Sequence, residues 1–334
     1  MLFAGGTVDE NAVKAASGEV LEVGSGVRVA GWAISSGKGP ITPDADLEHI
    51  KQDLHTLAAP EQFYGHNFLR LTHEASGLVI SFTALDALKG WLADQSPAVH
   101  VGESEEWLRA RQADVEAHAA ERLEYDWTYT TSYTGTVTCG GSSSGNATAD
   151  ASSAATSDPS PHTQEAAAGA VAAGIAGVAA NGPASSAAGG SVRWEATSSQ
   201  INRALLTSRD PILYYDELAL YESELDDHGS SRVSLKVRVM PRCWYVLLRF
   251  WLRVDHVMVR LRETRLFCQF DSEPASAPTV LREVRHHEGT FADLRKAGAP
   301  AEGPAYADPD TAAAALMAVA PIGVTQYRIE QLCL

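Results

Sequence analysis

The sequence is short of cysteine and of basic residues. Only four of its 334 residues are cysteines, and none belongs to a Cys-x-x-Cys pair. Neither a zinc knuckle nor a disulfide framework is therefore indicated, and the thiols are expected to be reduced, as in the cytosol or nucleus. Lysine and arginine total 26 against 42 aspartates and glutamates, which gives a net charge of −16. Binding to nucleic acid or to an anionic membrane is not expected of so negative a chain.

Long hydrophobic runs are also lacking. The longest uncharged apolar tract, residues 166–180, is too short and too rich in alanine to span a bilayer. The amino terminus has no basic segment followed by an apolar stretch, so no secretory signal is expected. Aromatic residues make up only 7% of the chain, and much of its 45% hydrophobic content is alanine. We expect a soluble protein of the cytoplasm or nucleus, with a core smaller than the length suggests.

One segment differs sharply in composition from the rest. Residues 123–192 contain no lysine or arginine, and residues 139–192 consist almost wholly of Ala, Gly, Ser and Thr. Such a segment cannot bury enough apolar area to offset the entropy lost on ordering. We predict that 139–192 is a disordered insertion within one discontinuous domain, formed by 27–138 plus 193–334, and that 1–26 is a flexible extension.

Strands and helices alternate before the insertion. Strand-like patterns cover Val27 to Ile34, Phe68 to Thr72 and Leu78 to Phe82. A helix is expected from an N-cap at Thr42, with a buried face of Leu47, Ile50, Leu54 and Leu57. A second helix should follow a cap at Thr83, with Leu85, Leu88 and Leu92 on one face, and a third should cover 104–123. The predicted fold class is α+β, with antiparallel sheets flanked by helices.

The chain after the insertion is strongly β-like. Residues 230–240 alternate, with Val233, Leu235, Val237 and Val239 on one side. Residues 244–254 and 257–266 then predict a hairpin with a two-residue turn, Asp255-His256. If Val254 lies opposite Val257, one face of the hairpin is a continuous hydrophobic surface. The other face then carries Arg249, Trp251, Arg253, Met258, Arg260 and Arg262.

Four arginines on one sheet face repel one another unless carboxylates neutralise them. The carboxylates of residues 215–227 can supply this neutralisation from within the protein. Alternatively, the surface accepts an acidic, partly aromatic peptide, through the guanidinium groups and through stacking on Trp251. The sequence favours neither interpretation over the other.

A second cluster offers weaker chemistry. Asp226, Asp227 and His228 can in principle ligate a metal or serve a hydrolase. Adjacent residues point in different directions, however, and no fourth ligand is apparent. A polar turn is the better interpretation, and we predict no cofactor and no metal.

Several motifs resemble a known family. Tyr125-Asp126-Trp127-Thr128-Tyr129-Thr130-Thr131, and a block from Ile212 to Leu266 containing ELDDHG, LKVRVMP, LLRFWLRVD and ETRL, look like the TIPRL family of TOR-signalling regulators. The resemblance covers most of 27–138 and 193–290. His256 departs from it, because the family commonly has glycine at that place in the hairpin turn.

The resemblance implies a non-enzymatic regulator. Such a protein binds the catalytic subunits of type 2A serine/threonine phosphatases, including their acidic C-terminal tail, and restrains activity or alters holoenzyme assembly. The family's contact residues fall on Asp86, Ile201, Leu261 and Glu263, the last two replacing a Met and an Asp, and Trp127 of the first motif is expected to join them. The chain is expected to be a monomer before it binds. A hydrolase built on Asp226 and His228, and a pure scaffold, are the alternatives.

Overall fold

A computed structural model describes most of the chain outside the alanine-rich insertion. The described residues are 6–21, 25–97, 99, 126–139, 192–225, 228–270, 277–300, 303–318 and 324–334. The predicted third helix (104–123) and nearly all of the predicted insertion lie outside them, as do Asp226 and Asp227.

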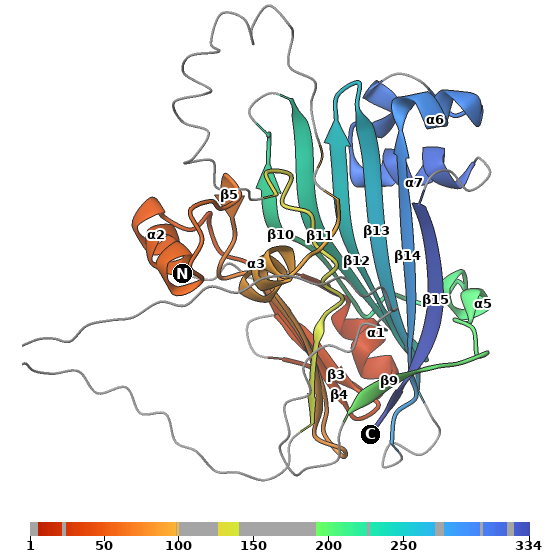
Figure 1. The fold of residues 1–334 in the computed structure, drawn as a ribbon. Coiled ribbons are helices and arrows are strands. Elements are labelled where there is room, and N and C mark those ends of the chain that lie inside the picture. Colours follow the sequence, from red (N-terminus) through yellow and green to blue (C-terminus); the bar gives the residue numbers. More distant parts are fainter. Residues whose placement is uncertain are drawn as a thin grey trace, which may run out of the picture. The chain divides into compact units, whose positions relative to one another are not determined.

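The larger of two antiparallel sheets has nine strands (Figure 1). Its main order is β1-β10-β11-β12-β13-β14-β15-β9, and β5 pairs with β10. The strands are β1 (Thr7–Val8), β5 (Gln62–Phe63), β9 (Arg193–Ala196), β10 (Tyr214–Ser223), β11 (Gly229–Met240), β12 (Cys243–Val254), β13 (Met258–Gln269), β14 (Val280–Thr290) and β15 (Val324–Cys333). The predicted strands after the insertion are confirmed, and Val233, Leu235, Val237 and Val239 are all buried.

The smaller sheet has six strands in the order β2-β3-β4-β6-β7-β8. They are β2 (Glu19–Val20), β3 (Gly26–Val29), β4 (Trp32–Gly37), β6 (Phe68–His73), β7 (Leu78–Thr83) and β8 (Thr136–Cys139). The expected pair β6–β7 is confirmed. The single strand expected over 27–34 is wrong, because Ala30 and Gly31 adopt φ values of 49° and 78° and turn the chain into a hairpin.

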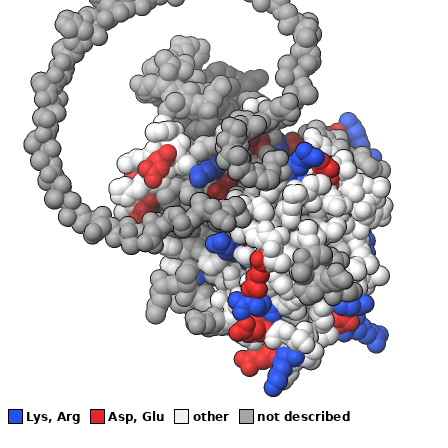
Figure 2. Space-filling model, turned by 90° about the horizontal axis from the view of Figure 1, so that it is seen from below, with Lys and Arg blue, Asp and Glu red and all other residues white. Residues whose placement is uncertain are grey.

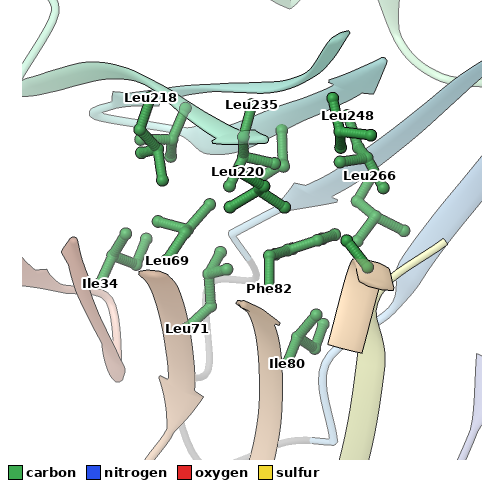
Figure 3. Packing of buried hydrophobic residues seen from close by; sticks show 14 of the residues in the cluster. Ile34, Leu69, Leu71, Ile80, Phe82, Leu218, Leu220, Leu235, Leu248 and Leu266 are labelled. Atoms are coloured by element: carbon green, nitrogen blue, oxygen red, sulfur yellow. The ribbon is translucent and has the colours of Figure 1, made fainter. Parts of the chain in front are cut away.

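The main core lies between the two sheets. Leucine, isoleucine and phenylalanine side chains from β4, β6 and β7 point toward leucines from β10, β11, β12 and β13 (Figure 3). Trp32 of β4 meets Trp244 of β12 edge to face, with ring centroids 5.1 Å apart. We call the face of the large sheet that joins this core the inner face, and the opposite one the outer face.

Short helices cover the ends of the outer face. They are α5 (Arg203–Leu206), α6 (Phe291–Lys296), the 3-10 turn η2 (Gly303–Tyr306) and α7 (Pro309–Met317). One apolar cluster joins Trp251, Val259 and Leu261 of the sheet to α6, η2 and α7. Another joins Phe267 and Leu281 of the sheet to Ile201 and α5. The outer face between these two clusters carries mainly polar and charged side chains.

The remaining helices precede the insertion. They are α1 (Glu10–Ala15), α2 (Asp44–Asp53) and α3 (Ala84–Leu92). Thr83 caps α3 as predicted, because its Oγ1 accepts a hydrogen bond from the Asp86 backbone N–H at 3.1 Å. The apolar face predicted for α2 is shorter than expected, because the helix stops at Asp53. Leu57, which was predicted to belong to that face, is 71% exposed. Thr42 does not cap α2, since its hydroxyl accepts from the Gly65 backbone instead.

Part of the amino-terminal region predicted to be flexible is structured. The strand β1 pairs with β10, and β2 pairs with β3. Between them, α1 buries Ala12 and Val13 in the main core. Little in the local pattern indicates this structure, because α1 is short and its two buried residues are small.

Candidate functional site

The hairpin of β12 and β13 is shifted by one residue from the predicted register. Val254 pairs with Met258 rather than with Val257, so the loop has three residues. His256 within it has a left-handed φ of 61°. The Val257 N–H donates to the Val254 carbonyl at 3.0 Å, so His256 is the third residue of a β-turn, a position where a type II turn requires a positive φ.

This shift separates the four arginines that were predicted to lie together. Side chains alternate along a strand, so a shift of one residue moves all of β13 to the opposite face relative to β12. Arg249 and Arg253 lie on the outer face with Trp251, whereas Arg260 and Arg262 lie on the inner face. The predicted single cationic face is therefore wrong.

The inner-face arginines bind groups of the protein itself. Arg260 is 2% exposed, donates two hydrogen bonds to Glu288 at 2.6 and 2.8 Å, and donates a third to Thr130. Arg262 donates to Asp94 at 2.8 Å and to Ser96. Both arginines thus fasten segments before the insertion onto the large sheet. The protein therefore neutralises these two arginines itself, as one of the two interpretations expected, but the carboxylates do not come from residues 215–227.

The outer-face arginines belong to a larger system. Glu263 is 1% exposed and accepts hydrogen bonds from Arg249 at 2.7 Å and from Arg265 at 2.5 Å. Arg265 also donates to Glu283, which is 3% exposed, at 2.7 Å. These contacts follow from the register, because Arg249 lies opposite Glu263 and Arg265 lies opposite Glu283 on neighbouring strands.

The same system extends to both helical covers. Toward α5, Glu283 pairs with Arg285 at 2.7 Å and with Arg203 at 3.4 Å. Toward α7, Arg249 donates to Asp310, which also pairs with Lys236 at 2.8 Å. Lys236 in turn lies 3.3 Å from Glu217. We call these residues the ion-pair chain; they are Arg203, Arg285, Glu283, Arg265, Glu263, Arg249, Asp310, Lys236 and Glu217.

Burial and neighbouring charge act in opposite directions within the ion-pair chain. Burial is the strongest single influence on Arg249 and disfavours its charged form. Glu263 and Asp310 outweigh it together, so the pKa of Arg249 lies above its ordinary value. The pKa of Arg265 is raised in the same way, with Glu263, Tyr245 and Glu283 overcoming burial. The guanidinium groups therefore stay charged although they are mostly covered.

One accessible end of the ion-pair chain lies next to α5 and β15; at its other end, Asp310 and Glu217 are 64% and 42% exposed. The Arg203 side chain is 60% exposed and that of Arg285 is 24% exposed. The Arg285 guanidinium lies 5.1 Å from the ring centroid of Tyr327, which is 54% exposed. On the face drawn in Figure 2, several basic and acidic side chains stand beside one another. Arg203, Arg285 and Tyr327, which we call the rim, combine one exposed and one partly exposed cation with an exposed aromatic ring.

The ion-pair chain holds one cation more than it holds carboxylates. Its basic members number five and its acidic members four. In a protein of net charge −16 this surplus is local. Partly exposed guanidinium groups can donate further hydrogen bonds to an acidic partner.

Three of the four family-implied residues lie on this outer face. Glu263 is at the centre of the ion-pair chain, and Ile201 and Leu261 are buried in the apolar clusters under α5 and under α6 and α7. Ile201 and Leu261 are 6% and 0% exposed. They therefore shape the outer face by holding the helices in place, rather than by presenting their own side chains.

The other predicted site residues lie elsewhere. Asp86 is on α3, where its carboxylate accepts from Thr136 of β8 at 3.0 Å. The Trp127 indole is partly buried and donates to the Val99 carbonyl at 2.9 Å. Arg253 pairs with Asp255 of its own hairpin loop at 2.7 Å. The structure does not bring these three side chains into the ion-pair chain.

Sequence reasoning missed Arg203, Arg265, Glu283, Arg285 and Asp310. Alternating charges along β14 were a usable sign, since Glu283 and Arg285 share one face of that strand. No local pattern indicates the role of Asp310, because it follows Arg249 by 61 residues and reaches it only through the packing of α7.

Neither a metal site nor a membrane span is found in the described part of the chain. No group of three or more His, Cys, Asp or Glu side chains there could hold a metal ion. None of the helices there has the length and apolar character needed to cross a membrane. Asp226 and Asp227 of the alternative hydrolase site lie outside the described residues.

Comparison with known proteins gives a consistent result. The sequence model of the TIP41-like family matches residues 62–295. A TIP41-like protein from Arabidopsis thaliana is 35% identical over 305 residues, which is 91% of each chain. A TIP41-like protein from Homo sapiens is 30% identical over 266 residues, 79% of this chain and 76% of its own. The type 2A phosphatase activator TIP41 of Saccharomyces cerevisiae is 28% identical over 288 residues, 82% of this chain and 65% of its own.

Proposed function

Because this chain belongs to the TIP41-like family, we propose that it regulates type 2A serine/threonine phosphatases by binding their catalytic subunit. The name of the yeast relative, a type 2A phosphatase activator, supports the partner class. That name also favours activation as the net effect, in contrast to the restraint that the family resemblance implied. The protein is then a stoichiometric regulator rather than an enzyme.

The outer face supports this proposal. Glu263 and the two residues that position the helical covers, Ile201 and Leu261, come from separate parts of the sequence and meet on one sheet face. This convergence is the observation that carries the proposal.

We propose that the rim receives the acidic tail of the catalytic subunit. Arg203 and Arg285 offer guanidinium donors to carboxylates, and Tyr327 offers a ring for an aromatic side chain. The buried members of the ion-pair chain fix the positions of these exposed cations, because Arg203 and Arg285 both pair with Glu283. A preorganised cation loses less entropy on binding than a freely rotating one.

Binding of the full chain to a purified type 2A catalytic subunit tests this proposal. Calorimetry should show a 1:1 complex, and removal of the acidic tail should weaken it by about tenfold or more. A phosphopeptide dephosphorylation assay on the same samples gives the direction of regulation, and a rise in rate is expected. Absence of a complex with the intact subunit would contradict the proposed function, and equal affinity for the tailless subunit would contradict the role of the tail.

A further inference from the structure

The connection between β14 and β15 is much longer than their pairing requires. The two strands are antiparallel neighbours, and such strands are commonly joined by loops of about two to five residues. Here residues 291–323 lie between them. Within this connection α6, η2 and α7 fold over one end of the outer face (Figure 1). We call residues 303–317, which form η2 and α7, the α7 segment.

The α7 segment supplies a carboxylate to cations of the sheet. Asp310 pairs with Lys236 of β11 at 2.8 Å and with Arg249 of β12. The hydrogen bond from Lys236 is the strongest influence on Asp310, and together with Arg249 it outweighs burial, so the pKa of Asp310 lies below its ordinary value. Asp310 thus holds, from within the chain, two cations that the carboxylate of a partner can otherwise bind.

The apolar contact of the α7 segment with the sheet is small. Its buried members in the apolar cluster are Tyr306, Ala312, Ala313 and Leu316. Two of these four are alanines, which remove little area from water. In the same cluster, the Nε1 atom of Trp251 is buried without a hydrogen-bond partner among the described residues. A buried donor that lacks an acceptor costs free energy, so the closed arrangement is less stable than full pairing would make it.

Hydrogen bonds within the connection itself hold the start of the α7 segment together. The Asp308 carboxylate accepts from the backbone N–H groups of Asp310 and Thr311 at 2.8 and 3.0 Å. The Tyr306 hydroxyl donates to the Pro300 carbonyl at 2.8 Å. None of these bonds involves the sheet. A segment with internal bonds and a small apolar contact to its neighbours can open as a unit at a lower free energy than global unfolding.

We propose that the α7 segment occupies a docking surface of the outer face that a partner protein takes over. This surface combines the cations Lys236 and Arg249 with the side chains of Trp251, Val259 and Leu261. It accepts a partner segment that carries a carboxylate beside small apolar side chains, which is the chemistry that the α7 segment itself presents. Binding then requires the α7 segment to move aside, and this opening lowers the apparent affinity. That the partner is the phosphatase rests on the proposed function, whereas the opening does not.

Amide hydrogen exchange of the free full chain tests the opening. Backbone amides of α7 should exchange at least about tenfold faster than those in the middle of β12 and β13. Asp310→Asn should speed exchange in α7 by about threefold, because it weakens the contacts with Lys236 and Arg249. Asp46→Asn, which removes the same charge from the first turn of α2, is the control and should leave α7 unchanged. Exchange in α7 as slow as in the strands, or no effect of Asp310→Asn, would overturn the proposal.

Binding to the type 2A catalytic subunit separates this proposal from the proposed function. Asp310→Asn should bind about threefold more tightly than the parent, because exchange and binding depend on the same opening. Leu316→Ala, which weakens the apolar contact without altering a charge, should act in the same direction.

The complex itself gives a second measurement. Addition of the catalytic subunit to the parent chain should speed exchange in α7. Slower or unchanged exchange there in a complex that has formed would overturn the proposal and leave the proposed function standing. If no complex forms, the proposed function fails, and exchange in the free chain alone decides whether the α7 segment opens.

Discussion

Arg249 and Glu263 lie directly opposite each other on β12 and β13, and Arg249 Nε donates to Glu263 Oε1 at 2.7 Å. Their pairing depends on the three-residue hairpin loop. A two-residue loop would have put Leu248 opposite Glu263 and moved the carboxylate to the inner face. The loop that holds His256 therefore determines which face carries the ion-pair chain.

Replacing Glu263 with Gln should destabilise the protein strongly. The change leaves the mostly buried guanidinium groups of Arg249 and Arg265 without a shared counter-charge. Breaking a buried ion pair from one side costs about 3–5 kcal/mol. Urea denaturation measures the loss. The control is Glu195→Gln, at an exposed position on β9, which should unfold at nearly the same urea concentration as the parent. A comparably small change for Glu263→Gln would mean that solvent reaches the Glu263 carboxylate.

Glycine at position 256 should stabilise the hairpin. His256 has a φ of 61°, a conformation that costs an L-residue other than glycine about 1–2 kcal/mol. His256→Gly removes that cost but adds chain entropy to the unfolded state, so a gain of about 0.5–1 kcal/mol is expected. His256→Val should have the opposite effect. Thermal unfolding of the parent, the glycine variant and the valine variant measures these effects. A higher Tm for the valine variant than for the parent would refute the assigned loop conformation.

Stability should fall as the pH drops from about 6.5 toward 4, because of His286. Burial first, and then the charges of Arg262 and Arg328, lower the pKa of His286 from 6.5 to about 4, while Asp94 and Glu288 partly oppose this. The unfolded chain therefore takes up the proton before the folded chain does, which favours unfolding throughout this window. Between pH 7 and pH 5 the loss amounts to about 2 kcal/mol.

The His286→Gln variant tests this assignment. Its unfolding free energy should depend less on pH between 7 and 5 than that of the parent, and His49→Gln, on the exposed side of α2, serves as the matched control. An unchanged pH dependence in His286→Gln would show that other groups titrate in this range.

Local patterns predicted much of the fold. The alternation of apolar residues placed β6, β7 and β11 to β13 correctly in outline, and Thr83 predicted the start of α3. The face of the small helix α2 was predicted only in part, because Leu57 follows the last helical turn and stays in solvent. Such features depend on residues that are close in the sequence, and they can therefore be predicted from the sequence alone.

The candidate site could not be predicted in the same way. One additional residue in the hairpin loop that contains His256 moves every later side chain of β13 to the opposite face. The alternation of apolar residues alone does not determine the length of that loop. The carboxylates that bind the arginines are also remote: Asp94 is 168 residues from Arg262, and Asp310 is 61 from Arg249. Only packing of the whole domain brings such pairs together.

The most direct test of the proposed binding face compares two charge-reversed proteins for affinity to the type 2A catalytic subunit. Arg203→Glu with Arg285→Glu changes the rim, and Arg28→Glu with Arg70→Glu makes the same change of net charge on the small sheet. Calorimetry should show the rim variant weakened by at least about tenfold and the small-sheet variant within about twofold of the parent. Equal affinities of the two variants would contradict a binding site on the outer face.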